Sequence, residues 1–132
     1  METGYYRTQE LGMTQSQIRK KMKEGKLFRI RRGWYCTHEP SMLDQLFVLQ
    51  LMHPELVFSG KTALALHLRE IPEGDIEALI PKNKRIPNIK GVKIKRSRSL
   101  KSEPGMIFRC VSMLEAAITI AEEERPPNLI EK

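Results

Sequence analysis

The sequence contains few cysteines, few aromatic residues and no long apolar run. Its two cysteines are Cys36 and Cys110, and 6% of its residues are aromatic. The cysteines are far apart and have apolar neighbours, so we predict buried free thiols and no disulfide. No apolar run approaches the roughly 18 residues that cross a bilayer, and METGYYRTQE at the start lacks the apolar segment of a secretory signal. We therefore expect a cytoplasmic protein.

Neither a metal site nor a complete nucleotide-binding loop is present in the sequence. The three histidines and two cysteines do not fall at metal-ligand spacing, so we predict no metal. GKT at residues 60–62 matches the end of a Walker A loop, but Glu55 stands where the first glycine is needed. A carboxylate there would repel the phosphates that the backbone amides must wrap. We instead predict a short buried strand over residues 56–58, with Ser59 as the N-cap of a packed helix.

Catalytic signatures are also missing. Asp75 and Glu77 are neighbours on a predicted strand, but no lysine follows at the spacing of a metal-dependent nuclease. Glu122, Glu123 and Glu124 end a predicted helix and are typical of a solvated surface. We predict no enzymatic activity and no cofactor.

A surplus of cations is the first functional indication. The chain carries 23 Lys and Arg against 16 Asp and Glu, which gives a net charge of +7 and a pI near 9.6. Such a surplus attracts polyanions, with nucleic acid favoured and acidic membranes as the competing partner. Net charge alone is weak evidence for such a partner, because many basic proteins bind nothing acidic. The evidence depends on whether the cations gather on one face or one loop.

The N-terminal third predicts two helices followed by a basic hairpin. Thr14 and Gln17 form a capping box, which begins a helix that should end at Gly25. Residues 7–11 predict a short helix before it, and a glycine-containing turn between two helices is typical of a helix-turn-helix. KLFRIRRGWYCT then predicts paired strands near residues 27–31 and 34–37. A basic hairpin directly after such a helix is typical of a wing.

The remainder predicts a small mixed part. Ser41 and Asp44 form a second capping box ahead of an apolar helix, and Ser112 and Glu115 open a last helix that should end before Pro126 and Pro127. DIEALI, GVKIKRS and GMIFRCV predict three strands. We therefore predict an α+β fold, with a winged helix-turn-helix over residues 1–39. The second part, residues 40–132, is predicted to be a small α/β unit with a short mixed or antiparallel sheet.

The helix over residues 14–24 has a polar outer face. Ile18 and Met22 are four residues apart and are expected to face inward. The outer face should carry Gln15, Ser16, Arg19, Lys20 and Lys23. These side-chain types bind base edges and phosphates in a major groove. The alternative is an ordinary solvated helix face.

The hairpin carries three arginines. Strand alternation predicts Arg29 and Arg31 on the same side, where they repel each other unless an anion is present, and Arg32 at the tip. The alternative is a cationic strand edge that prevents aggregation. Trp34 and Tyr35 could stack on bases, but we favour packing in the core.

A second basic segment follows later in the chain. It runs from Lys82 to Lys101, and residues 78–102 contain no Asp or Glu. Such a run is typical of a solvated loop and strand edge, and it could also extend an electropositive surface onto flanking phosphates.

These residues together resemble one family. The run from Gly4 to Tyr35, with TQELGMTQSQIRKKMKEGKLFRIRRGWY, resembles the N-terminal winged helix-turn-helix of the AbiE-system (abortive infection, type IV toxin-antitoxin) antitoxins. VFSGKTALALHL is similar to a helix of that family, and the order IEALIPK, GVKIKRS, GMIFRCV and helix is similar to the remainder. Because the family usually has a further helix ahead of this motif, we expect residues Leu43, Leu46 and Phe47 to complete the small core.

The resemblance implies a bacterial DNA-binding protein that represses its own operon and counteracts a nucleotidyltransferase-like toxin without necessarily touching it. Separately, the C-terminal part could form a homodimer or meet a partner. By position, the outer face of the helix matches the recognition helix, and the three hairpin arginines match the wing. A rival hypothesis is an interaction or antitoxin module that neutralises an acidic partner. A nuclease or nucleotide-dependent enzyme is a more distant third.

Overall fold

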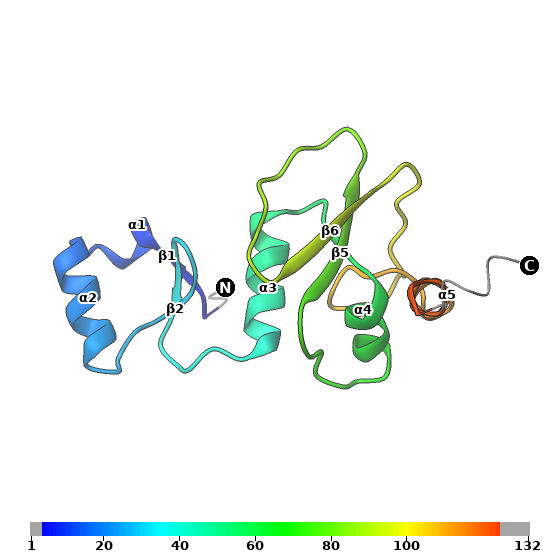
Figure 1. Cartoon of the computed structure of the whole chain (residues 1–132). Coiled ribbons are helices and arrows are strands. Elements are labelled where there is room, and N and C mark those ends of the chain that lie inside the picture. Colours follow the sequence, from blue (N-terminus) through cyan, green and yellow to red (C-terminus); the bar gives the residue numbers. More distant parts are fainter. Residues whose placement is uncertain (1–3, 125–132) are drawn as a thin grey trace, which may run out of the picture. The chain divides into compact units, whose positions relative to one another are not determined.

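The structure, a computed structural model, describes residues 4–124 and divides into two compact units (Figure 1). Unit 1 is Met1–Met52 and unit 2 is His53–Lys132. The sequence predicted a boundary after residue 39, but the helix Met42–Met52 groups with unit 1. The physical reason is that Val48 of this helix packs against Ile30 and Cys36 of the hairpin.

Unit 1 contains six elements. In chain order they are β1 (Tyr6–Arg7), α1 (Thr8–Leu11), α2 (Gln15–Lys23), β2 (Phe28–Arg31), β3 (Trp34–Cys36) and α3 (Met42–Met52). The predicted capping box begins α2, since the Gln17 amide donates to Thr14 Oγ1 at 3.2 Å and the Thr14 amide donates to Gln17 Oε1 at 2.8 Å. Gly25 follows the helix with φ 73°, a left-handed conformation that suits glycine. The predicted helices and hairpin are therefore confirmed.

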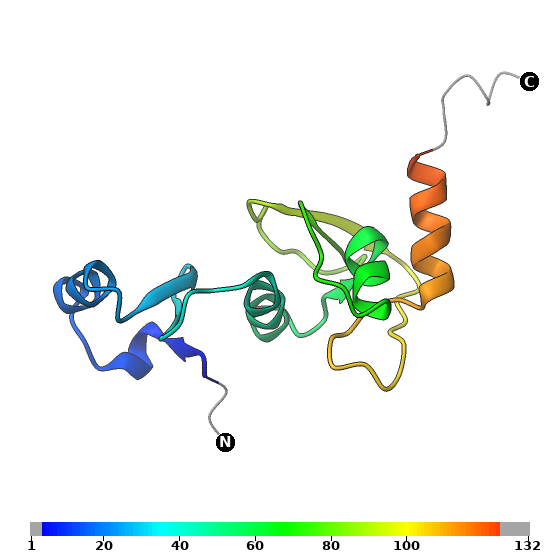
Figure 2. The same ribbon diagram turned by 90° about the horizontal axis from the view of Figure 1, so that it is seen from below.

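The sheet of unit 1 has the order β1-β3-β2 and is antiparallel throughout. Strand β1 was not predicted, because two residues are too few to show alternation. One side of the sheet packs Tyr35 against Ile18 and Leu27, and the other packs Ile30 and Cys36 against α3. Figure 2 shows α2 and α3 on opposite sides of the hairpin.

The packing tests several sequence predictions about side chains in unit 1. Tyr35 is 5% exposed, so it lies in the core, and Trp34 packs at the edge of the cluster on the α3 side. Ile18 is 2% exposed as predicted, but Met22 is 37% exposed, so the inward placement of Met22 was wrong. Helix α3 contributes to the core as expected, and the ring of Phe47 lies 6.2 Å from that of Tyr5.

Unit 2 contains five elements around a second small sheet. They are β4 (Val57–Phe58), α4 (Gly60–His67), β5 (Ile76–Pro81), β6 (Val92–Ser97) and α5 (Met113–Glu123). The sheet order is β4-β5-β6, with β4 antiparallel and β6 parallel to β5. The predicted α+β class is therefore confirmed, and the short sheet of the second part, predicted to be mixed or antiparallel, is mixed. The predicted last helix also forms, with the Glu115 amide donating to Ser112 Oγ at 3.1 Å. Pro126 and Pro127 lie outside the described residues.

The third predicted strand of unit 2, GMIFRCV, was wrong. Only one bridge, Phe58 with Cys110, joins this segment to β4. The Phe58 amide donates to Arg109 O at 2.7 Å, and the Val111 amide donates to Phe58 O at 2.9 Å. Because β4 is two residues long, its free edge has few backbone groups to offer, and a longer ladder cannot form.

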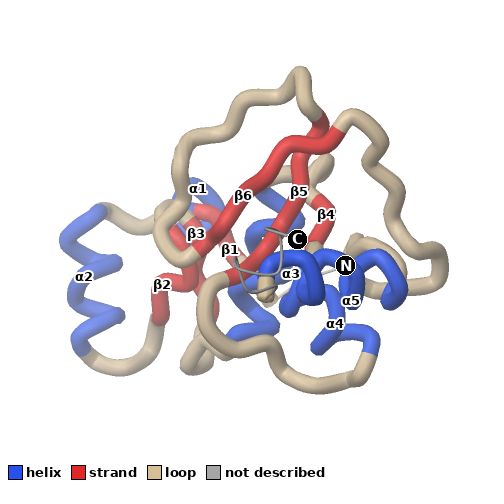
Figure 3. The backbone as a smooth tube through the Cα atoms, turned by 45° about the vertical axis from the view of Figure 1, so that its right-hand side comes forward, coloured by secondary structure: helices blue, strands red, loops and turns tan. Residues whose placement is uncertain are grey.

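The connection between β5 and β6 is a loop. Parallel strands are usually joined by a crossover helix, but residues 82–91 contain none, and Figure 3 shows them as an open loop above the sheet. Within the described residues, no helix has the length and apolar character that crossing a bilayer requires.

Candidate nucleic-acid interface

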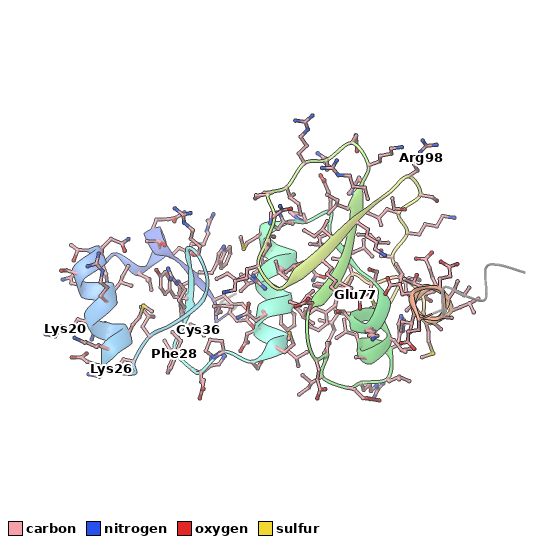
Figure 4. All side chains as sticks on the ribbon, viewed as in Figure 1. Lys20, Lys26, Phe28, Cys36, Glu77 and Arg98 are labelled. Atoms are coloured by element: carbon pink, nitrogen blue, oxygen red, sulfur yellow. The ribbon has the colours of Figure 1, made fainter. Side chains whose placement is uncertain are left out.

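The outer face of α2 is exposed because the opposite side of the helix, with Ile18, is buried. Ile18 packs in the core with Leu27 and Tyr35, so the side chains on the opposite side of the helix remain in solvent. The exposed residues there are the five predicted ones, Gln15, Ser16, Arg19, Lys20 and Lys23. Figure 4 shows Lys20 on this helix.

None of the cations in this set forms an ion pair with a described residue. The ion pairs of unit 1 that involve lysine or arginine instead join Arg7 to Glu10 at 3.5 Å and Lys26 to Glu24 at 3.8 Å. Lysines in the last turn also stabilise α2, because its C-terminal end carries a partial negative charge. The face therefore combines amide, hydroxyl and cationic donors that are accessible to a polyanion.

A bulge in the hairpin separates Arg29 from Arg31. Arg29 pairs with Tyr35 and Arg31 pairs with Trp34, so Ile30 is an extra residue in β2. Residues paired across strands share a face of the sheet. Arg29 therefore lies on the face of Tyr35, toward α2, and Arg31 lies on the face of Trp34. The prediction that both arginines share one side was wrong, because simple alternation takes no account of the bulge.

Burial also distinguishes the three hairpin arginines. Arg29 and Arg32 are exposed, whereas Arg31 is half-buried and its Nε has no hydrogen-bond partner among the described residues. Burial lowers the pKa of the Arg31 guanidinium. Gly33 follows Arg32 at the turn with φ 82°, which places Arg32 at the tip. Arg29 is thus the hairpin arginine on the α2 side, and Arg32 lies exposed at the tip.

A shallow groove beside the α1–α2 turn contributes cations that were not predicted as site residues. Its volume is about 430 Å³, and it is lined by Gly12, Met13, Gln17, Lys20, Lys21, Glu24 and Lys26. Lys21 and Lys26 therefore border the same surface as Lys20. Their position beside the α1–α2 turn is a tertiary feature, since Lys26 lies beyond the end of α2.

No protein-family model matches the chain, and no curated protein matches it either. The resemblance to AbiE-system antitoxins therefore stays a prediction from the residues quoted above.

In the GKT run, Gly60 and Thr62 are buried in unit 2 and Lys61 is exposed. The Lys61 amide donates to Glu77 Oε2 at 3.1 Å, and the Glu77 amide donates to Thr62 Oγ1 at 2.9 Å. The Ser59 amide donates to Glu77 O at 2.9 Å. Gly60 has φ 54°, and a Cβ added there would lie 2.5 Å from Glu77 Oε1. All of these contacts join the beginning of α4 to one residue of β5.

Glu77 therefore occupies the N-terminus of α4, where a P-loop would hold phosphate. Figure 4 shows Glu77 beside this helix. Ser59 is the N-cap residue as predicted, but its side chain makes no capping hydrogen bond. The carboxylate of Glu77 accepts from the helix amide instead, which suits the partial positive charge of the helix N-terminus.

A polar groove with mixed charges lies along the same face of the unit 2 sheet. Its volume is about 330 Å³, and it is lined by Ser59, Glu77, Ala78, Leu79, Lys93, Lys95, Ser97, Ser99, Glu115, Thr119 and Glu123. Lys95 donates to Glu123 Oε1 at 2.9 Å, which raises the pKa of Lys95. Among the described residues, no group of three or more His, Cys, Asp or Glu side chains is arranged to hold a metal ion. Three carboxylates in this groove disfavour a polyanion there.

Proposed function

We propose that this protein is a sequence-specific repressor that binds double-stranded DNA in the bacterial cytoplasm, with unit 1 as its winged helix-turn-helix. The antitoxin-like part of the proposal is that it autoregulates a toxin–antitoxin operon. One observation carries the DNA-binding proposal: α2 presents an exposed face of amide, hydroxyl and cationic groups with no carboxylate partner among the described residues.

The roles follow from the positions on the helix. Residues near the N-terminus of a recognition helix are nearest the base edges in a major groove, which assigns base contacts to Gln15, Ser16 and Arg19. Lys20 and Lys23 would contact phosphates, and Arg29 would add a phosphate contact from the hairpin. The sequence predicted this role for both Arg29 and Arg31, and the bulge assigns it to Arg29.

The primary experiment is a fluorescence-anisotropy titration with the DNA upstream of the protein's own gene, compared with an unrelated duplex at several salt concentrations. If about five phosphates are contacted, the logarithm of the binding constant falls against log salt with a slope of roughly −4 to −5. Preference for the upstream DNA supports repression. An affinity that does not change with salt would contradict the proposal.

Three single variants test the division of roles. Arg19→Ala should weaken the specific site by about 10- to 100-fold and the unrelated duplex much less, because a lost base contact costs about 1–3 kcal/mol. Arg29→Ala should weaken both duplexes equally. Arg31→Ala is the matched control, with the same loss of charge on the other face of the sheet, and should change neither by more than about twofold. Equal effects of Arg19→Ala and Arg29→Ala on both duplexes would show that the roles are wrongly divided.

A second candidate function is the protein-interaction or antitoxin module. The observation that favours it is on α5, where Leu114 is 71% exposed and Ile118 is 48% exposed. Ala117 and Ala121 continue the same exposed apolar stripe. A protein partner on this stripe would co-purify after nuclease digestion and would be lost from Leu114→Asp, whereas a DNA-only function would leave binding of Leu114→Asp to the upstream duplex unchanged.

A further inference from the structure

The carboxyl ends of β5 and β6 lie side by side in unit 2. The two strands are parallel, and their last residues, Pro81 and Ser97, are paired. The chain leaves both strands at the same edge of the sheet, and neighbouring strands are about 5 Å apart. The basic residues that follow the two strands are therefore brought to one edge, although they are separated in the sequence.

Hydrogen-bonded turns hold the backbone at this edge. The Lys82 amide donates to Ser97 O at 3.1 Å, and the Lys84 amide donates to Pro81 O at 3.1 Å. After β6, the Ser99 amide donates to Ser97 Oγ at 3.3 Å, which closes a turn around Arg98. The cations here therefore project from ordered backbone, which reduces the entropy lost when they bind.

The charge at this edge is poorly compensated. We define the carboxyl-edge surface by its exposed cations, Lys82, Lys84, Arg85 and Arg98. Glu55 pairs with Lys84 at 3.1 Å, and the other three cations form no ion pair with a described residue. Figure 4 shows Arg98 pointing away from the ribbon. Like charges held together are stabilised by an anion that binds across them.

The shape of this surface indicates an extended ligand. A small anion needs convergent donors in a pocket, but none of the four residues lines the polar groove of unit 2. These four cations are exposed, and residues 82–101 contain no aromatic side chain. Such a surface suits a phosphate backbone and offers nothing to stack on bases. We infer that the carboxyl-edge surface binds the backbone of duplex DNA without reading its sequence, as a second contact beyond unit 1. The inference rests on the proposed DNA-binding function and needs no particular arrangement of the two units.

The test compares two triple variants of the full chain that lose the same charge. The edge variant is Lys82→Gln, Arg85→Gln and Arg98→Gln. The control variant is Lys61→Gln, Lys90→Gln and Lys93→Gln, which removes exposed cations away from the carboxyl ends of the strands. Both are titrated with an unrelated duplex at several salt concentrations, after circular dichroism and thermal melting have shown that each folds like the wild type.

The edge variant should reduce the magnitude of the salt slope by about 2 to 3, since each lost phosphate contact contributes about 0.9. The control variant should reduce it by less than about 1. Equal slopes for the two variants, or an edge variant indistinguishable from the wild type, would overturn the inference.

A third variant, Arg19→Gln with Lys20→Gln and Lys23→Gln, separates the two ideas. If it binds like the wild type while the edge variant is weakened, then the role proposed for unit 1 fails and the carboxyl-edge surface stands. If it is weakened while the edge and control variants agree, then the role of unit 1 stands and the inference fails.

Discussion

Asp44 offers the most quantitative test of how unit 1 is held together. This residue is 8% exposed and lies in the first turn of α3. Its carboxylate accepts hydrogen bonds from Tyr5 Oη at 2.6 Å, from the Ser41 amide at 2.8 Å and from Ser41 Oγ at 3.1 Å. His38 Nε2 lies 2.9 Å from the same carboxylate. The buried Asp44 side chain therefore links Tyr5, just before β1, and the segment between β3 and α3 to the first turn of α3.

The charge on Asp44 is stabilised by these contacts. Burial by itself would raise its pKa, but the donors from Ser41, Tyr5 and His38 outweigh burial and lower the pKa from 3.8 to about 2. Burial and the hydrogen bond to Asp44 raise the pKa of the Tyr5 hydroxyl, so Tyr5 remains a donor. A shift of this size corresponds to about 2 kcal/mol, because one pKa unit is about 1.4 kcal/mol.

The sign of the pH dependence follows from the direction of the shift. Since the pKa is lower in the folded state, the unfolded chain binds the proton first as the pH falls. The stabilisation is therefore complete above about pH 5, falls to roughly half at pH 3, and is nearly lost at about pH 2.

The assay is urea unfolding followed by the fluorescence of Trp34, the single tryptophan, which lies in unit 1. Asp44→Asn should reduce the free energy of unfolding by about 2 kcal/mol at pH 6 and by about 1 kcal/mol at pH 3. Glu39→Gln is the control, because it removes an exposed carboxylate from the same unit and should have little effect. A loss that is the same at both pH values would refute the argument and assign the effect of Asp44→Asn to packing alone.

Two further predictions concern a glycine of unit 2 and the two buried cysteines, one in each unit. In thermal melting, Gly60→Ala should destabilise unit 2 more than Gly74→Ala. Both glycines have positive φ, which costs an alanine about 1–3 kcal/mol. Only the Cβ added at residue 60 meets the Glu77 carboxylate, with Oε1 2.5 Å away. Equal losses would show that Glu77 moves away without cost. Cys36 and Cys110 are both 0% exposed, and burial raises the pKa of each thiol. Both thiols should therefore react slowly with Ellman's reagent in the folded protein and fully in urea, and rapid reaction of either one in the folded protein would contradict its burial.

Predictions from the sequence succeeded where neighbouring residues determine the structure. Thr14 and Gln17 satisfy each other's backbone amides within one helical turn, so α2 begins where the local pattern predicts. The tight turn at Gly33 depends on a left-handed conformation that glycine adopts readily. Both features require no partner from elsewhere in the chain.

Predictions failed where distant segments decide the outcome. The β2 bulge depends on how β2 pairs with β3, and it moves Arg31 to the other face from Arg29. GMIFRCV has the composition of a strand, but its neighbour β4 is too short to form more than one bridge with it. For the candidate interface, the sequence located the polar face of α2, but the hairpin arginine on the same side could be chosen only after the register was known.

The sequence by itself determined the α+β composition, the start and end of most helices, and the basic character of α2 and of the segment from Lys82 to Lys101. These features depend on local hydrogen bonding, turn conformation and residue type. Only the tertiary structure decided that α3 belongs to unit 1, that Glu77 fills the N-terminus of α4, and that the basic residues after β5 and β6 meet at one edge. Each of these depends on contacts between residues far apart in the chain, and a local pattern contains no information about which distant partner will be chosen.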